Sequence, residues 1–348
     1  MIYTRSKQRL KKLPLLALAI ACTLLLINWA GPAPAQDVLP NPSSSFVPPA
    51  ADTLRVGTHL RSLDTKDLEN NSFDAHLMMW TLWSGDPADN PSDNLTILND
   101  VYTDDSTLFE KQDSKQYQGS TWTLYSVRSR FIHRWRLDDY PFDAHVLSMR
   151  IGFSNPLRQD ITLEADQTNS GVSPELYFYG WNIGNLGISH SEQQVLSSLG
   201  IPALATDEGA KIQAITTTLE LKRNPLIYFI PNFSLNIVAV CLCVLALLIR
   251  TSRDDLILAA VVLAAGNYTY LTSILPEAAL AGFVGQLQAI VLAGIVYVIC
   301  SDTIIEQKLL GMAPKMAQFL RSAVLPSYLL VTILAIYTII PGGVVNVG

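Results

Sequence analysis

Charged residues are scarce in this chain. Only 16% of its 348 residues are Asp, Glu, Lys or Arg, and 49% are hydrophobic, whereas about a quarter of a typical soluble domain is charged. This balance argues against a single soluble globule. Basic residues are the rarer sign, with 24 Lys and Arg against 30 Asp and Glu and a net charge of −6. The chain therefore lacks the large cationic surface that a nucleic-acid partner requires.

Cysteine is absent from residues 36–223. Cys22 precedes this region, and Cys241, Cys243 and Cys300 lie in the long apolar runs that follow it. A disulfide therefore cannot brace the region, which is nevertheless long enough to build a hydrophobic core of its own. The sequence shows no Cys/His spacing typical of a zinc site, so we expect no metal and no cofactor.

Catalytic motifs are missing as well. The sequence holds no G-x-S-x-G, H-E-x-x-H or G-x-x-x-x-G-K-[ST] string, the strings that mark nucleophile elbows, zinc proteases and phosphate loops. We therefore expect a protein that is not an enzyme.

Residues 1–35 have the pattern of a signal peptide. Basic residues precede an apolar run from Leu13 to about Ala30, and Ala33-Pro34-Ala35 supplies the small residues of a cleavage site. We expect cleavage after Ala35. The alternative is an uncleaved membrane anchor, because the apolar run is long for a signal. Residues 36–53, rich in Pro and Ser, predict a flexible leader.

Residues 54–223 predict a β-sandwich. Short apolar or alternating runs recur between clusters of Gly, Pro, Asn and Asp, a pattern typical of an antiparallel, immunoglobulin-like sandwich. The expected strands are Leu54–Leu60, Phe73–Trp83, Leu95–Tyr102, Thr121–Trp135, Val146–Phe153, Trp181–Ser189 and Ile212–Leu221.

Residues 224–348 predict a bundle of four transmembrane helices. The apolar runs cover about 226–249, 256–274, 282–305 and 323–340, and each is long enough to cross a bilayer. The first and third connections carry the basic residues Arg250, Arg253, Lys308, Lys315 and Arg321. The positive-inside rule places these connections in the cytoplasm, and therefore the N-terminal domain and the C-terminus on the opposite side.

Four short motifs occur in an order that resembles one family. Phe73–Trp83 (FDAHLMMWTLW) is similar to the family's second strand, and Arg136–Asp143 (RLDDYPFD) carries the Pro-Phe-Asp of a loop usually closed by a disulfide. Lys222–Pro225 (KRNP) enters the first span, and Leu271–Pro276 (LTSILP) ends the second. Together they resemble the pentameric ligand-gated ion channels, the Cys-loop receptor superfamily, in the bacterial form without the cysteines. The resemblance implies a homopentamer in a bacterial inner membrane, with an extracellular ligand-binding domain.

The resemblance also implies a path from the sandwich to the pore. In the family the Pro-Phe-Asp loop rests on the membrane domain, so we expect Asp143 to pair with Arg223 where strand meets helix. The segment that follows the second span lies beneath the sandwich. The expected coupling residues are Pro141, Phe142, Asp143, Arg223, Pro276 and Glu277.

In the family, the second span of each subunit lines the pore. The candidate residues for pore lining and selectivity are Asp254, Asp255, Leu258, Ala259, Val262, Gly266, Thr269 and Ser273. A helical face drawn from Asp255 runs through Leu258 or Ala259, Val262, Gly266, Thr269 and Ser273. Five copies of a carboxylate at a narrow mouth favour cations. The alternative is that Asp254 and Asp255 only stabilise the helix dipole. We expect Arg253, beside them, to offset part of their field.

The middle of this span is apolar, where familiar channels place Ser or Thr. Such a stretch either gates the pore by dewetting or belongs to a protein that does not conduct. We therefore expect an ion channel for inorganic cations, and the alternative is a non-conducting membrane-anchored receptor of the same architecture. Residues 306–321 form a cytoplasmic link too short for a folded output domain, which favours the channel.

Agonists of the family bind in an aromatic cage between sandwich domains. The candidates here are Trp80, Tyr102, Trp122, Tyr125, Phe153, Tyr177 and Tyr179, each of which is also a candidate for the sandwich core. Residues 191–210, at the position of the capping loop, contain no aromatic residue, which argues against an amine. Protons are the alternative stimulus, because the domain contains five histidines, which titrate near neutral pH: His59, His76, His133, His145 and His190.

A few polar or helix-breaking residues interrupt the spans. In lipid, Pro231 and Asn232 of the first span and Gln286 and Gln288 of the third leave backbone or amide groups unsatisfied. We expect all four to face protein.

Overall fold

The structure is a computed structural model and describes residues 48–50, 52–64, 71–101, 108–155, 158, 160–195, 210–249, 252–305 and 314–341. The predicted signal peptide, most of the predicted leader and Tyr102 lie outside these residues. The β domain and the four helices that follow it belong to one compact unit.

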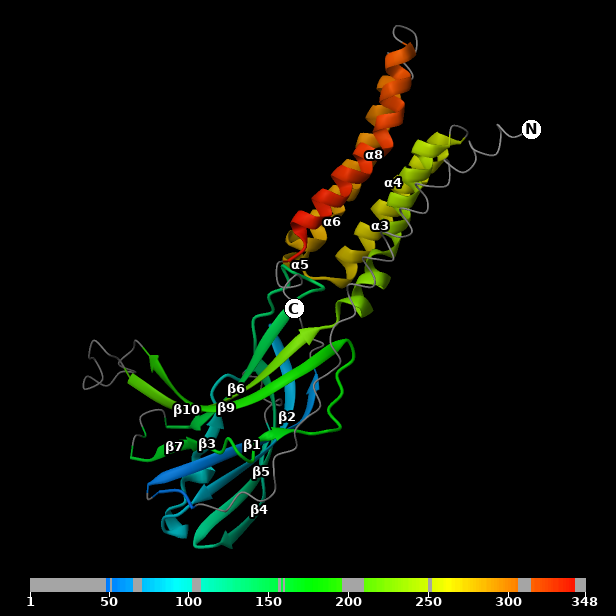
Figure 1. The fold of residues 1–348 in the computed structure, drawn as a ribbon. Coiled ribbons are helices and arrows are strands. Elements are labelled where there is room, and N and C mark those ends of the chain that lie inside the picture. Colours follow the sequence, from blue (N-terminus) through cyan, green and yellow to red (C-terminus); the bar gives the residue numbers. More distant parts are fainter. Residues whose placement is uncertain are drawn as a thin grey trace. The chain divides into compact units, whose positions relative to one another are not determined.

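The β domain consists of two sheets (Figure 1). Its strands are β1 Thr53–Asp64, β2 Ser72–Trp83, β3 Leu95–Ile97, β4 Leu108–Tyr117, β5 Ser120–Ile132, β6 Ala144–Phe153, β7 Thr162–Ala165, β8 Gly171–Val172, β9 Trp181–Val195 and β10 Ala210–Arg223. One sheet has the order β4-β5-β2-β1-β7, with β8 also paired to β1, and the other has the order β3-β6-β10-β9. Each segment that the sequence predicts as a strand overlaps one of these strands, and most of the strands extend beyond the predicted bounds.

The larger sheet is mixed, which corrects the expectation of purely antiparallel strands. β1 runs antiparallel to β2 but parallel to both β7 and β8. These two strands are four and two residues long, too short to show the alternation from which strands are predicted. The sequence analysis did not predict the charged strand β4, because its side chains are mostly exposed and its apolar residues do not alternate with polar ones.

The two sheets share one hydrophobic core. Along β2, alternate residues such as Phe73, Leu77 and Met79 are fully buried, while the residues between them are only half-buried. Thr58 of β1 and Thr217 of β10 are buried, and their hydroxyl oxygens lie 2.9 Å apart. This pair satisfies two polar groups inside the core and joins the two sheets directly.

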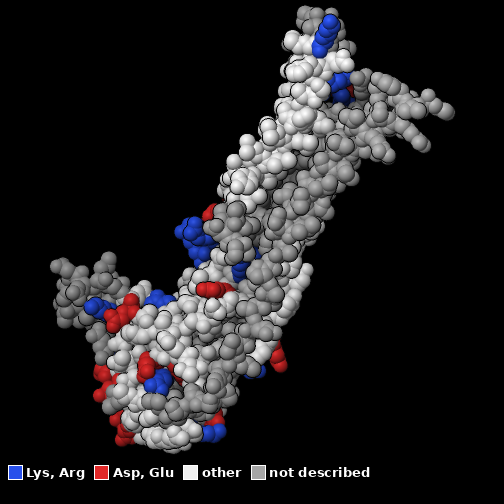
Figure 2. Space-filling model, viewed as in Figure 1, with Lys and Arg blue, Asp and Glu red and all other residues white. Residues whose placement is uncertain are grey.

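Among the described residues, four helices after Arg223 are long and apolar enough to cross a membrane, which indicates a multi-pass membrane protein. They are α3 Pro225–Leu248, α4 Arg253–Ile274, α6 Phe283–Thr303 and α8 Pro314–Ile339, and the short α5 Glu277–Ala281 joins α4 to α6. Where the helices are not covered by grey atoms, their visible face shows Lys and Arg side chains at the far tip and uncharged surface below it (Figure 2). This distribution suits a segment that spans a bilayer.

The residues expected to avoid lipid behave in two ways. Asn232 and Gln288 are buried, as predicted, whereas Pro231 and Gln286 are exposed on the single chain. α3 continues through Pro231 without a break. One face of each helix packs against the bundle and the other does not, so the helix face on which a residue lies decides whether the residue is buried.

Candidate functional site

The turn Tyr140–Asp143 meets the end of β10 at the junction of the β domain and the helices. Its Tyr140–Pro141 peptide is cis. β6 begins directly after this turn and pairs with β10, so that Ala144 lies opposite Lys222. This register places Asp143 beside Arg223, whose backbone N–H donates to the Asp143 carbonyl oxygen over 3.1 Å.

Asp143 and Arg223 form the ion pair that the sequence suggests. Arg223 Nε lies 2.7 Å from Asp143 Oδ1, and a terminal guanidinium nitrogen lies 3.0 Å from Oδ2. Both residues are 3% exposed. Two parallel hydrogen bonds from a planar guanidinium fix geometry as well as charge, so this pair sets the angle between the end of β10 and the turn.

Aromatic rings enclose the guanidinium of Arg223. Its central carbon lies 4.1 Å from the ring centroid of Trp181, 4.8 Å from that of Tyr228 and 4.9 Å from that of Tyr140. The electron-rich ring faces attract a cation, most strongly where water is excluded. The rings come from β9, from the turn and from α3, so a single charge draws three elements together.

His145 is a third member of this buried group, and the sequence analysis did not assign it a partner. An ionised carboxylate only accepts hydrogen bonds, so His145 Nε2 donates to Asp143 Oδ2, 2.9 Å away. The D-x-H spacing at the start of β6 was an available signal, because residues two apart on a strand share a face. On its other side His145 meets His133, with Nδ1 and Nε2 3.5 Å apart.

Titratable groups at the junction have shifted pKa values, among them Asp143 and His133. Burial of Asp143 disfavours its charge, but hydrogen bonds from His145 and Arg223 outweigh burial and lower the pKa of the carboxyl below its usual value. Burial, together with the neighbouring His145, lowers the pKa of His133 to about 4. At neutral pH the junction therefore holds an ionised Asp143 and a neutral His133.

The turn touches the helices at several points. Tyr140 accepts a hydrogen bond from Asn232 of α3, with 2.5 Å between oxygen and nitrogen. Phe142 meets Phe283 at the start of α6 edge to face, with 5.1 Å between ring centroids. The Phe283 N–H donates to the carbonyl oxygen of Asp138 over 2.7 Å, and a Cβ on Gly282 would collide with that carbonyl.

The structure brings four of the six coupling candidates together. Pro141, Phe142, Asp143 and Arg223 belong to the junction. Pro276 is half-buried before α5, and Glu277 is exposed on α5. The turn meets the residues that follow α5, which sequence analysis had not singled out.

The candidate pore face of α4 is uncovered on the single chain. Asp254, Asp255, Leu258, Val262, Gly266, Thr269 and Ser273 are all exposed, and Ala259 is half-buried. Leu258 and Val262 are 64% and 61% exposed, although they are apolar. The buried face consists of Ala260, Ala264, Asn267 and Leu271. The first turn contains both carboxylates, a position that also suits the helix dipole.

The positive charge of Arg253 is paired inside the bundle. Arg253 forms an ion pair with Asp302 of α6, and its Nε donates to the carbonyl oxygen of Ala246 in α3 over 2.9 Å. Its side chain is 10% exposed. Because Asp302 already balances its charge, Arg253 offsets the field of Asp254 and Asp255 less than the sequence suggested.

A cavity of about 400 Å³ lies on the β domain, and two of the ligand candidates line it. Its walls include Trp80 of β2, Trp122 of β5, Lys115, Tyr117 and Asp166. Trp80 lies so close to Gly57 that a Cβ there would overlap the indole ring. The indole N–H donates to Asp166 Oδ2 over 3.0 Å. These two contacts hold Trp80 in place as one wall.

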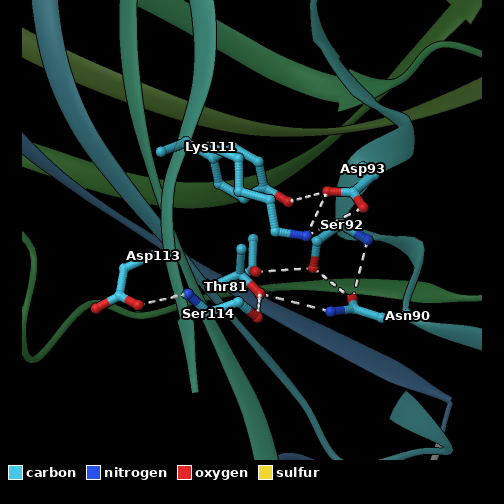
Figure 3. A network of polar contacts seen from close by, with 9 residues as sticks. Thr81, Asn90, Ser92, Asp93, Lys111, Asp113 and Ser114 are labelled. Carbon is cyan, nitrogen blue, oxygen red and sulfur yellow. Dashed lines mark hydrogen bonds and ion pairs between the residues drawn. The ribbon is translucent and has the colours of Figure 1, made fainter. Parts of the chain in front are cut away.

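The remaining aromatic candidates lie elsewhere. Phe153 is buried, whereas Tyr177 and Tyr179 are 78% and 66% exposed. Tyr125 is buried, and its hydroxyl donates to Asp93 over 2.7 Å. Asp93 also pairs with Lys111 of β4, in a network that fastens residues 90–93 to the sheet (Figure 3).

No protein-family model matches this chain, and a search of curated proteins finds no match.

Breaking the buried pair should destabilise the protein strongly. We expect Arg223→Met to cost about 3–5 kcal/mol, because it removes the cation that balances the buried carboxylate of Asp143 and leaves it only the hydrogen bond from His145. The matched control is Arg130→Met, since Arg130 pairs with Asp74 at a more exposed site and such pairs contribute about 1 kcal/mol or less. Denaturant unfolding of the detergent-solubilised protein measures both. Equal losses in the two variants would contradict the assignment of the junction as the stronger pair.

Acidification should destabilise the protein through His133. The unfolded state takes up a proton on this group near pH 6.5, whereas the folded state resists until about pH 4, so stability falls as pH drops through that window. His133→Gln should flatten the dependence, and His190→Gln, at an exposed site on β9, should leave it unchanged. Thermal unfolding midpoints at pH 7, 5.5 and 4.5 provide the readout. A parallel decline in the wild type and His133→Gln would refute this origin.

Proposed function

We propose that the protein is a homopentameric, ligand- or proton-gated channel selective for cations, with α4 of each subunit lining the pore. In this proposal the two sheets form an immunoglobulin-like sandwich on the periplasmic or extracellular side of a bacterial inner membrane. The resemblance of the four sequence motifs to pentameric ligand-gated ion channels supports the proposal.

The observation that carries the proposal is the difference between the exposed faces of α4 and α8. Along its middle α8 exposes apolar side chains such as Leu330, Val331 and Leu334, as expected of a helix against lipid, and the exposed polar side chains toward its ends are Lys315, Gln318, Ser322 and Thr338. α4 differs in exposing carboxylates, Asp254 and Asp255, at one end, in addition to hydroxyls such as Thr269 and Ser273 toward the other. Carboxylates and hydroxyls aligned on one exposed face suit a water-filled path better than lipid.

The hydroxyl groups on this face are oriented in a way that suits cations. Thr269 Oγ1 donates to the Ala265 carbonyl oxygen, and Ser273 Oγ donates to that of Tyr270, over 3.1 and 2.7 Å. Each hydroxyl hydrogen is thereby used within the helix. The free lone pairs of the oxygens then remain for ions or water in the proposed pore.

The charge balance at the opposite end supports cation selectivity. Asp254 and Asp255 are exposed, whereas the nearby Arg253 is turned into the bundle and paired with Asp302. Five subunits would then place carboxylates around the mouth with their nearest cation neutralised. A ring of this kind attracts cations and repels anions.

Gating in this proposal passes through the junction. A rearrangement of the β domain would move the Tyr140–Asp143 turn, which contacts both Asn232 of α3 and Phe283 of α6. α6 is joined to α4 by α5. The cavity lined by Trp80 and Trp122 is the candidate agonist site, and His133 is the candidate for a response to protons.

One observation favours the second candidate, a non-conducting receptor of the same architecture. From Leu256 to Ala265, α4 contains only Leu, Ile, Ala and Val. A constriction lined by such residues sheds water, and a pore that never rewets carries no current.

The number of subunits is the first test. Native mass spectrometry of the full chain, released from mild detergent, should show five copies. A monomer or dimer that persists across several mild detergents would leave α4 no ring to line and would remove the channel proposal.

Ion selectivity tests the role of Asp255. In a salt gradient, Asp255→Asn should move the reversal potential toward zero, because it removes a ring of carboxylates from the mouth. The charge-matched control is Glu175→Gln, which removes an exposed carboxylate of the β domain and should leave the reversal potential unchanged. Currents are recorded from purified protein in planar bilayers. Wild-type selectivity in Asp255→Asn would exclude this residue as the filter.

A further inference from the structure

Polar side chains from three helices meet inside the bundle. Asn236 of α3 donates from Nδ2 to Gln288 Oε1 of α6 over 2.9 Å, and Gln288 Nε2 donates to the Ala264 carbonyl oxygen of α4 over 2.9 Å. Asn267 lies one turn beyond Ala264 on the same buried face of α4. We call Asn236, Ala264, Asn267 and Gln288 the three-helix node.

The carbonyl of Ala264 fixes the orientation of the amides in the node. A carbonyl only accepts, so Gln288 presents Nε2 to it and turns Oε1 toward Asn236. Asn236 in turn presents Nδ2 to that oxygen. Its own Oδ1 is therefore directed away from Gln288.

Two polar atoms of the node remain without a partner among the described residues: Asn236 Oδ1 and Asn267 Nδ2. Their residues are 3% and 1% exposed. Asn236 Oδ1 is an acceptor and Asn267 Nδ2 is a donor. Asn236 itself contacts Gln288, and Asn267 lies one helical turn from Ala264, whose carbonyl oxygen Gln288 also contacts. Asn236 lies about 16 Å along α3 from its first residue, by helical rise, at a depth where lipid offers no hydrogen bonds.

Leaving both atoms unpaired would be destabilising, because each gives up its hydrogen bonds to water on burial and gains none in return. A direct bond between them would remove the cost, but the structure has none. A small molecule that both donates and accepts can satisfy the two at once. Water has this chemistry, and buried waters typically bridge such otherwise unsatisfied groups.

We propose that the three-helix node binds a water molecule that accepts a hydrogen bond from Asn267 Nδ2 and donates one to Asn236 Oδ1. The bound water closes a ring of hydrogen bonds through Gln288 and α4. The packing interface of α4 with α3 and α6 therefore includes a hydrated polar contact. This site belongs to the bundle of one chain and does not depend on whether the protein conducts.

The direct test is transfer of magnetisation from water to the side-chain amide of Asn267. The full-length protein, labelled with 15N-asparagine and reconstituted in lipid bilayers, is measured by magic-angle-spinning NMR, and Asn267→Leu identifies the signal. We expect transfer to Asn267, with the exposed Asn182 on β9 as the positive control. Transfer to Asn182 but none to Asn267 would overturn the proposal.

A double-mutant cycle tests whether one water serves both residues. Asn236→Leu and Asn267→Leu should each lower the thermal midpoint, and the double variant should lose less than their sum, because the shared water is lost only once. The control cycle pairs Asn267→Leu with Asn232→Leu, since Asn232 donates to Tyr140 instead, and should be additive. Additivity in the first cycle would overturn the shared site. If a variant fails to fold, the NMR measurement on the wild type decides the question instead.

Discussion

The ion pair between Arg223 and Asp143 is the constraint on which the junction depends. Arginine stays charged at every relevant pH, so burying it requires a carboxylate and ring faces in fixed positions. The end of β10, the start of β6 and the first turns of α3 therefore meet in one arrangement. The next residue, Asn224, caps α3 by accepting a hydrogen bond from the Leu226 N–H. A strand thus becomes a membrane helix within two residues of a buried charge.

Inside the helical bundle, where lipid offers no hydrogen bonds, polar side chains also pair across elements. Arg253 is neutralised by Asp302, Asn232 reaches Tyr140, and Gln288 contacts both neighbouring helices. Each of these contacts joins elements distant in sequence. The polar residues of the bundle are therefore few and placed where they fix how the helices pack.

Sequence analysis succeeded where a segment carries its own signal, either an alternation of apolar residues or a long apolar run. The alternation in β2 and the long apolar runs of the spans required no knowledge of neighbours. It failed where neighbours decide: β7 and β8 exist only as parallel partners of β1, and the exposure of Gln286 depends on which face of α6 meets the bundle. At the junction, Asp143 and Arg223 were predicted from motifs, whereas the role of His145 emerged only when β6 and β10 were paired.

The charged strand β4 has a consequence for how copies of this chain can associate. It forms one edge of the larger sheet, its register shifts between Lys111 and Asp113, and Lys115 pairs with Asp113 on its exposed surface. Edges that carry charges and irregular backbone resist pairing with a strand from another molecule. Copies of the chain are thus kept from extending this sheet into fibres along β4, and contacts there must be made by side chains.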